Sequence, residues 1–165
     1  MNVVVLDPPK PIVSLQQAKR HLRVEDDGED AYIADLVEVA TAHIDGPQGW
    51  LGLALGEQIL EATLCAPDWS ASRRVPIGPL REILSETPSV DGRSVAVRYR
   101  AGHPVSGEGA ALTSAVPAPI RHAILLMVGD LYANRESSGS IQSHEVAMPT
   151  TVKRLLMHYR IPLFA

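Results

Sequence analysis

The 165-residue sequence has one cysteine, few aromatic side chains and no long hydrophobic run. The single cysteine, Cys65, excludes an intramolecular disulfide framework and a cluster of thiolate metal ligands. Aromatic residues make up 4% of the chain, which leaves little material for base-stacking platforms or an aromatic-lined ligand pocket. The longest apolar run, residues 123–128, is far shorter than the roughly 20 residues that cross a bilayer. A membrane-spanning protein is therefore not expected.

An excess of positive charge is also lacking. The net charge of -4 and the isoelectric point of about 5.8 argue against a free-standing duplex-DNA binder, because such proteins neutralise phosphates with clustered Lys and Arg. Residues 1–7 lack the basic region and the apolar core of a signal peptide, so we expect an intracellular chain. With 45% hydrophobic and 21% charged residues, the composition is that of one globular domain, residues 1–165.

The first 46 residues have the pattern of an extended arm followed by two helices. Three prolines keep residues 1–13 non-helical. Ser14, with Gln17 three residues later, forms a capping-box pattern that begins the first helix. An acidic turn begins the second helix, and its apolar stripe ends at Gly46. Residues 14–46 are therefore expected to form a pair of helices.

After residue 46 the pattern changes to short strands divided by prolines and then returns to helix. The expected elements are a β insertion at 57–100 with strands at 58–65, 80–87 and 94–100, a glycine- and alanine-rich loop at 101–116, a central helix at 117–136, a flexible break at 136–140, and a C-terminal helix and apolar tail at 149–165. The central helix is apolar almost all round, which indicates cover by several neighbours. We therefore predict an α+β, mainly α fold: a helical bundle around a long central helix, with a small antiparallel β-sheet or hairpin insertion.

Motifs that carry catalysis or ligand binding are hard to find. The six histidines lack metal-ligand spacing, and no phosphate-binding loop or nucleophile elbow occurs. The acidic turn does not fit a calcium-binding loop. If Gly28 is aligned with the glycine that such a loop requires, Arg23 and Ala34 occupy positions where carboxylate ligands are needed. Cys65 follows an apolar strand and is expected to be buried. No catalytic, metal or cofactor residue is predicted.

Several segments, taken in order, resemble one family of structural proteins. They are SLQQAKRHLRV at residues 14–24 followed by the acidic turn, VRYRAG at 97–102, VPAPIRHAILL at 116–126, LYANRE at 131–136 and VKRLLMHYR at 152–160. Together they resemble head–tail connector (adaptor) proteins of long-tailed double-stranded DNA phages and phage-like gene transfer agents. The resemblance spans the chain from about Ser14 to Arg160, and the N-terminal arm, the loop at 102–109 and the apolar tail depart from it.

The resemblance implies a structural, non-enzymatic protein of the virion, at the head–tail junction, that is present in the bacterial cytoplasm during assembly. Such proteins form a ring of about twelve subunits under the portal and extend the DNA channel. The implied partners are the portal protein, neighbouring copies of the chain, and a tail-side stopper or tail-terminator protein. DNA passes through without sequence-specific binding, and neither a membrane nor a cofactor is involved. The implied portal-facing anchors are Tyr159, Ile161, Leu163 and Phe164, and the outer faces of helices 14–24 and 28–45 are candidate ring contacts.

Two other functions stay open on the residues alone. One is a small cytoplasmic enzyme whose site is assembled from scattered residues such as His103, His122 and Glu136, and clustering of these in a pocket would favour it. The other is a different phage morphogenesis factor, such as a tail-completion protein or a small packaging subunit. A packaging subunit needs a DNA-binding surface, and the sequence has no helix-turn-helix with a basic recognition helix.

Overall fold

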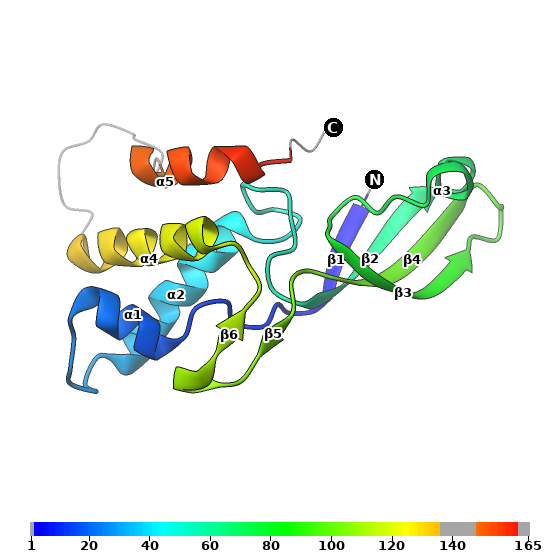
Figure 1. Ribbon diagram of the computed structural model, residues 1–165. Coiled ribbons are helices and arrows are strands. Elements are labelled where there is room, and N and C mark those ends of the chain that lie inside the picture. The colour runs from blue at the N-terminus through cyan, green and yellow to red at the C-terminus, as the bar shows by residue number, and fades with distance from the viewer. Residues whose placement is uncertain (1, 136–147, 162–165) are drawn as a thin grey trace.

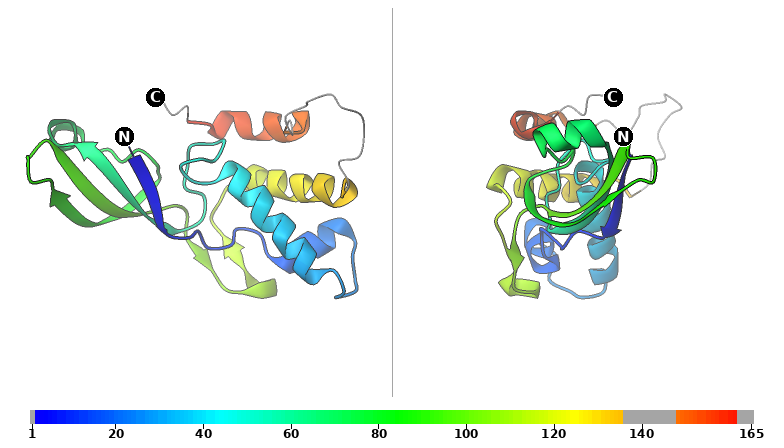
Figure 2. Two further views of the ribbon diagram at one scale, coloured as in Figure 1. Left: turned by 180° about the vertical axis from the view of Figure 1, so that it is seen from behind. Right: turned by 90° about the vertical axis from the view of Figure 1, so that its right-hand side faces the viewer.

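The protein consists of two lobes that lie end to end. The computed structural model describes residues 2–135 and 148–161. The helical lobe contains α1 (Leu15–Leu22), α2 (Asp30–Ile44), α4 (Ala118–Ala133), α5 (Thr150–Leu156) and the short 3-10 turn η2 (Met157–Tyr159). The sheet lobe contains β1 (Asn2–Asp7), β2 (Gln58–Cys65), α3 (Ala66–Ser72), β3 (Leu80–Pro88) and β4 (Ser94–Ala101). Figure 1 shows the helical lobe on the left and the sheet lobe on the right, and Figure 2 shows the N-terminal segment passing from the sheet to the helices.

The predicted helical bundle around a long central helix is wrong. The described residues form five short α-helices and a four-stranded antiparallel sheet, and α4, with 16 residues, is only one residue longer than α2. The sheet has its own hydrophobic core, separate from that of the helices. The difference has a physical source: Val3, Val4 and Val5 belong to no extended arm but to a strand that pairs with β2. This strand and α3 turn the expected insertion into a full lobe.

The helical lobe forms as its apolar periodicity predicts. The capping box at Ser14 is confirmed, since the Ser14 hydroxyl accepts the backbone N–H of Gln17 and the Gln17 side chain accepts that of Ser14. Helix α4 packs against α1, α2 and α5, which explains its apolar surface. The fully or nearly buried side chains of this core include Ile12, Ala18, Ile33, Ala40, Ile44, Leu51, Leu55, Ile120, Ala123, Ile124, Val128, Val152 and Leu156.

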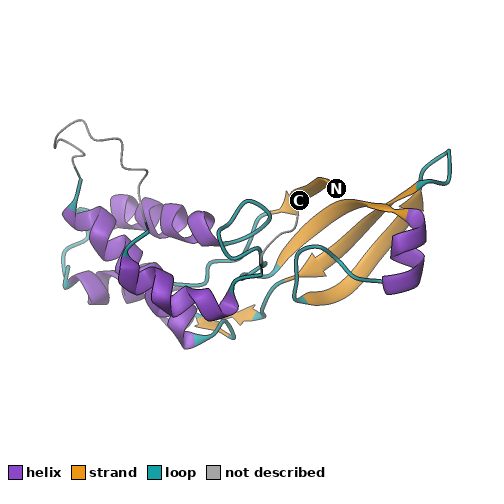
Figure 3. Cartoon of the chain, turned by 90° about the horizontal axis from the view of Figure 1, so that it is seen from above, coloured by secondary structure: helices purple, strands orange, loops and turns teal. Residues whose placement is uncertain are grey.

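The main sheet has the strand order β1-β2-β4-β3, with every pair antiparallel. The alternation predicted for the last strand is confirmed, because Val95, Val97 and Tyr99 are buried on one face. Trp69 of α3 is buried in the same core, and α3 lies at the end of the sheet remote from the helices (Figure 3). The free edges of the sheet are β1 and β3.

Three further expectations differ from the structure. Cys65 is exposed, since it lies at the end of β2 where the chain turns into α3. The proline at position 67 does not merely divide strands, because it lies in the first turn of helix α3, where proline is tolerated. The loop expected at 101–116 contains the small hairpin β5 (Val105–Ser106) and β6 (Thr113–Ser114), with the 3-10 turn η1 (Gly109–Ala111) between them. The break expected at 136–140 lies outside the described residues.

Candidate assembly surfaces

The C-terminal segment, which the resemblance implicates in portal binding, rests on the loop between α2 and β2. The backbone N–H of Ile161 donates to the carbonyl of Leu51 at 2.9 Å, and the guanidinium of Arg160 lies 4.7 Å from the ring centre of Trp50. Of the four expected anchors, Tyr159 is half-buried and packs on the helical core, whereas Ile161 is 50% exposed. Leu163 and Phe164 lie outside the described residues. The structure thus leaves the Ile161 side chain available to a partner.

Beside this segment is a shallow hollow with apolar and cationic walls. Its volume is about 420 Å³, and it is lined by Trp50, Thr150, Lys153, Arg154, Met157 and Arg160. Met157 is 60% exposed. None of the lining residues is acidic. This surface suits a partner that supplies carboxylates and an apolar side chain, because each would find its complement here.

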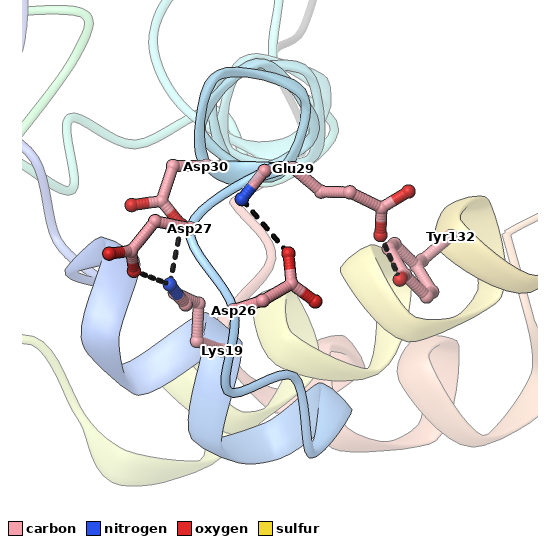
Figure 4. A network of polar contacts seen from close by, with 7 residues as sticks. Lys19, Asp26, Asp27, Glu29, Asp30 and Tyr132 are labelled. Atoms are coloured by element: carbon pink, nitrogen blue, oxygen red, sulfur yellow. Dashed lines mark hydrogen bonds and ion pairs between the residues drawn. The ribbon is translucent and has the colours of Figure 1, made fainter.

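The acidic turn between α1 and α2 clamps the two helices together. The Lys19 ammonium lies 2.7 Å from Asp27 and 2.6 Å from Asp30, so it joins α1 to the start of α2 (Figure 4). Asp26 accepts the backbone N–H of Gly28 at 2.9 Å and shapes the turn. The hydrogen bond from Lys19 lowers the pKa of Asp27, and the bonds to Asp27 and Asp30 raise that of Lys19. Lys19 therefore ties the two helices together.

Glu29, in the same turn, ties α2 to the end of α4. Its carboxylate accepts the hydroxyl of Tyr132 and lies 2.6 Å from the guanidinium of Arg135. Arg135 also lies over the rings of Tyr32 and Tyr132, at 4.8 Å and 4.6 Å from their centres. The hydrogen bonds from Tyr132 and then Arg135 lower the pKa of Glu29. The acidic turn and the segment at 131–136, which both contribute to the family resemblance, thus meet in one network inside the chain.

We expect Lys19→Met to lower the melting temperature more than Arg20→Met does. Both residues lie on α1, but Lys19 bridges two carboxylates while Arg20 is exposed. Thermal unfolding followed by circular dichroism at low and high salt measures the effect, and the difference between the variants should shrink in high salt. Equal losses in both variants would show that the clamp adds nothing beyond a surface charge.

The two lobes are joined around a buried carboxylate, Asp45, which is only 7% exposed. Asp45 follows the last residue of α2 and accepts the backbone N–H of Leu55 at 2.6 Å. The side-chain amide of Gln58, the first residue of β2, donates to both of its oxygens at 3.3 Å. Burial raises the pKa of Asp45 to about 6, although these hydrogen bonds act in the opposite direction. The sequence showed only a helix end at this point, so Asp45 was missed.

At the same junction, three stretches of backbone pack directly on one another. The N–H of Lys10 donates to the carbonyl of Glu57 at 3.1 Å, and the N–H of His103 donates to that of Leu55 at 2.8 Å. A side chain at Gly56 would overlap the carbonyl of Lys10, and one at Gly102 would overlap the carbonyl of Gly56. The arrangement is possible only because glycine brings no Cβ into the contact.

The residues suggested for an enzyme site are spread over separate parts of the molecule. His103 lies at the lobe junction, where burial and then the charge of Arg81 lower its pKa. His122 lies on α4, with its ring edge-on to that of His21 at 6.1 Å. Glu136 lies outside the described residues. Within residues 2–135 and 148–161, no group of three His, Cys, Asp or Glu side chains is placed to hold a metal ion. In the same part of the chain, no helix is long and apolar enough to cross a membrane.

Comparison with known proteins finds likeness in solved structures alone. No protein-family model and no curated protein matches the chain. A chain in the virion of a native gene transfer agent particle has a TM-score of 0.71 at 18% identity, and the match covers 100% of this chain and 98% of that one. A chain in the neck of an empty particle, computed with C6 symmetry, has a TM-score of 0.69 at 18% identity with the same coverage. One in the neck of the native particle, computed with C12 symmetry, has a TM-score of 0.63 at 16% identity, again with the same coverage. The chain therefore shares its whole fold with chains of these particles.

Proposed function

We propose that the chain is a head–tail connector of a tailed phage or a phage-like particle. It assembles as a ring on the portal, extends the DNA channel and links the capsid to the tail. The observation that carries this proposal is the fold likeness over the whole chain to chains in neck structures, one of them computed with twelvefold symmetry. The order of the sequence motifs supports the same function independently. The net charge of -4 suits a channel wall along which DNA slides, because it avoids a tight grip on phosphates.

The C-terminal segment is the proposed portal anchor, with Tyr159, Ile161, Leu163 and Phe164 as its contact residues. The support comes from the described part of this segment. Ile161 and Met157 are exposed apolar side chains next to the cationic hollow, and the chain end is held against Trp50 and Leu51. Apolar anchors beside a charged rim are typical of protein interfaces.

The test is assembly with the portal protein encoded beside this chain. The purified proteins are mixed and imaged by electron microscopy, with the full chain and with a chain lacking residues 160–165. We expect a ring stacked coaxially on the portal with the full chain, and loss of that ring on truncation. Ile161→Asp should reduce the bound fraction by about tenfold, since it places a charge in an apolar contact. Val90→Asp is the matched control, because Val90 is exposed at the far tip of the sheet lobe.

Failure of the full chain to bind the portal at any salt concentration would overturn the connector function. Binding that survives truncation would keep the connector function and overturn the anchor. One set of images distinguishes the two outcomes, because rings formed by the full chain and rings formed by the truncated chain are counted separately.

A further inference from the structure

Exposed apolar side chains gather on the two free edges of the main sheet. Of the nine large hydrophobic residues that are exposed in the described part of the chain, five lie on edge strands. Val4, Val5 and Leu6 on β1 are 48%, 41% and 45% exposed, and Leu80 and Leu84 on β3 are 40% and 38% exposed. Scattered apolar residues are ordinary on a surface, but their concentration on opposite edges of one sheet is not.

The edge formed by β1 is open along Asn2–Val5, and only the irregularity between Val5 and Asp7 interrupts it near its end. Strand Asn2–Asp7 contains no proline and no basic residue, and it pairs with β2 along one side only. Its residues 2–5 line an open groove of about 1710 Å³, whose other walls include α2 and the segment at 105–109. A strand of another chain therefore has both free hydrogen-bonding groups and room beside β1.

We propose that the β1 edge receives the β3 edge of a second copy of this chain, so that the sheets of neighbouring subunits join. The proposal rests on the connector function, because it assigns the contact between subunits of the ring. Since β1 and β3 are opposite edges of one sheet, each subunit contacts one neighbour through β1 and the other neighbour through β3. Such a head-to-tail contact closes into a ring by rotation, whereas a pairing of β1 with β1 would stop at a dimer.

Strand direction permits this pairing. Each strand of the order β1-β2-β4-β3 runs antiparallel to its neighbour, so β1 and β3 of one subunit run in opposite directions. A second copy placed beside the first in the same orientation therefore brings its β3 antiparallel to β1. The joined sheet continues the antiparallel order across the subunit boundary without a break.

Continuing the rows of the sheet across the boundary brings Val5 to the apolar Ile83 and Asp7 to the segment of β3 that contains Arg81. Val5 lies in the row of Leu60, Tyr99 and Ile83, and Asp7 lies in the row of Ile59, Arg100 and Glu82. If the rows continue across the boundary, Val4 and Val5 meet residues 83–85, and Asp7 meets residues 80–82.

Within residues 80–82, Arg81 is the side chain suited to Asp7. Glu82 is already paired with Arg100 of its own chain at 3.0 Å. Among the described residues, Asp7 and Arg81 take part in no ion pair within the chain. Strand β3 has register shifts against β4 at 80–82 and 83–85, so the proposal assigns each β1 residue to a pair of neighbouring β3 positions.

Charge reversal tests the pairing in the presence of the portal, with ring occupancy counted in electron micrographs and mass measured by ultracentrifugation. Asp7→Arg alone and Arg81→Asp alone should each reduce the fraction of complete rings by about tenfold, because like charges then face each other across the boundary. The double variant Asp7→Arg with Arg81→Asp should restore rings. Recovery in the double variant would indicate an ion pair between copies. If the single variants failed because they were poorly folded, combining two destabilising changes would not restore the rings.

Cysteine cross-linking tests the strand contact directly in a Cys65→Ser background. Val4→Cys is combined with Leu84→Cys in one protein and with Ser85→Cys in another, to cover both registers; paired side chains in antiparallel strands lie about 5 Å apart. We expect one of these to give a ladder of disulfide-linked oligomers under mild oxidation. Val4→Cys with Val90→Cys has the same number of thiols at exposed sites and should give none.

Three results would overturn the proposal. Rings that form normally with either single charge reversal would exclude the Asp7–Arg81 pair, and rings without a ladder would exclude the strand contact, while the connector function stands in both cases. Disulfide products that contain the portal protein instead of a second copy would assign the β1 edge to the portal. A chain that never occupies the portal would instead contradict the connector function itself.

Discussion

Replacing Asp45 with alanine is expected to lower the free energy of unfolding by about 3 kcal/mol near pH 5. The change removes the acceptor for the backbone N–H of Leu55 and for the amide of Gln58, and both groups lie in a buried position between the lobes. A buried donor without a partner costs roughly 1–3 kcal/mol. Urea unfolding followed by circular dichroism measures the loss. Asp35→Ala is the matched control, since Asp35 is an exposed aspartate on the same helix.

The loss on replacing Asp45 should depend on pH in a specified direction. Its native pKa of about 6 is above the ordinary value of 3.8, so the native state binds the proton more tightly than the unfolded state does. The resulting stabilisation is complete below about pH 3.8 and disappears as the pH rises through about 6. Between pH 5 and pH 7.5 it falls by roughly 1.4 kcal/mol. The gap between wild type and Asp45→Ala should narrow by that amount, and a constant gap would contradict the assignment of a raised pKa to this carboxyl.

Every helix except α3, and three of the strands, could be predicted because their signals are local. A capping box, a 3.6-residue apolar period or a two-residue alternation acts within about ten residues of chain, and these located α1, α2, α4, β2, β3 and β4. Strand β1 could not be recognised in this way. A short run of valines followed by prolines becomes a strand only because β2, more than 50 residues later, offers its edge.

The structure also shows what several of the motif residues do within the chain. Lys19 in the first segment bonds to Asp27 and Asp30 in the acidic turn, and Glu29 in that turn bonds to Tyr132 and Arg135 in a later segment. These contacts fix the helices of one subunit against each other. The motif at 14–24, the acidic turn and the motif at 131–136 therefore report contacts within the helical lobe, whereas Ile161 and β1, which carry proposed contacts with the portal and a neighbour, lie outside all the motifs. A motif comparison alone could not have placed them.

The largest effect of a single added methyl group is expected at the lobe junction, for Gly102→Ala. Gly102 has a φ of +99°, which disfavours every residue with a Cβ, and that Cβ would overlap the carbonyl oxygen of Gly56. The added Cβ is fixed to one stretch of backbone and overlaps atoms of another, so no side chain can rotate away to relieve the overlap. We expect a loss of about 3 kcal/mol or more in the free energy of unfolding by urea, from backbone strain and overpacking together.

Gly92→Ala separates the two causes of that loss. Gly92 also has a positive φ, +67°, but a Cβ there would meet nothing within 4 Å. It should therefore cost about 1 kcal/mol, from the backbone conformation alone. A Gly102→Ala variant that loses no more than Gly92→Ala would mean that the three backbone stretches separate easily. The lobes would then pivot on each other, and a sheet contact between neighbouring subunits would no longer hold the helical lobes in a fixed ring. A much larger loss at Gly102 would instead support a rigid junction between the lobes. Contacts between the sheet edges would then set the spacing of the subunits, and the helical lobes would have the same spacing.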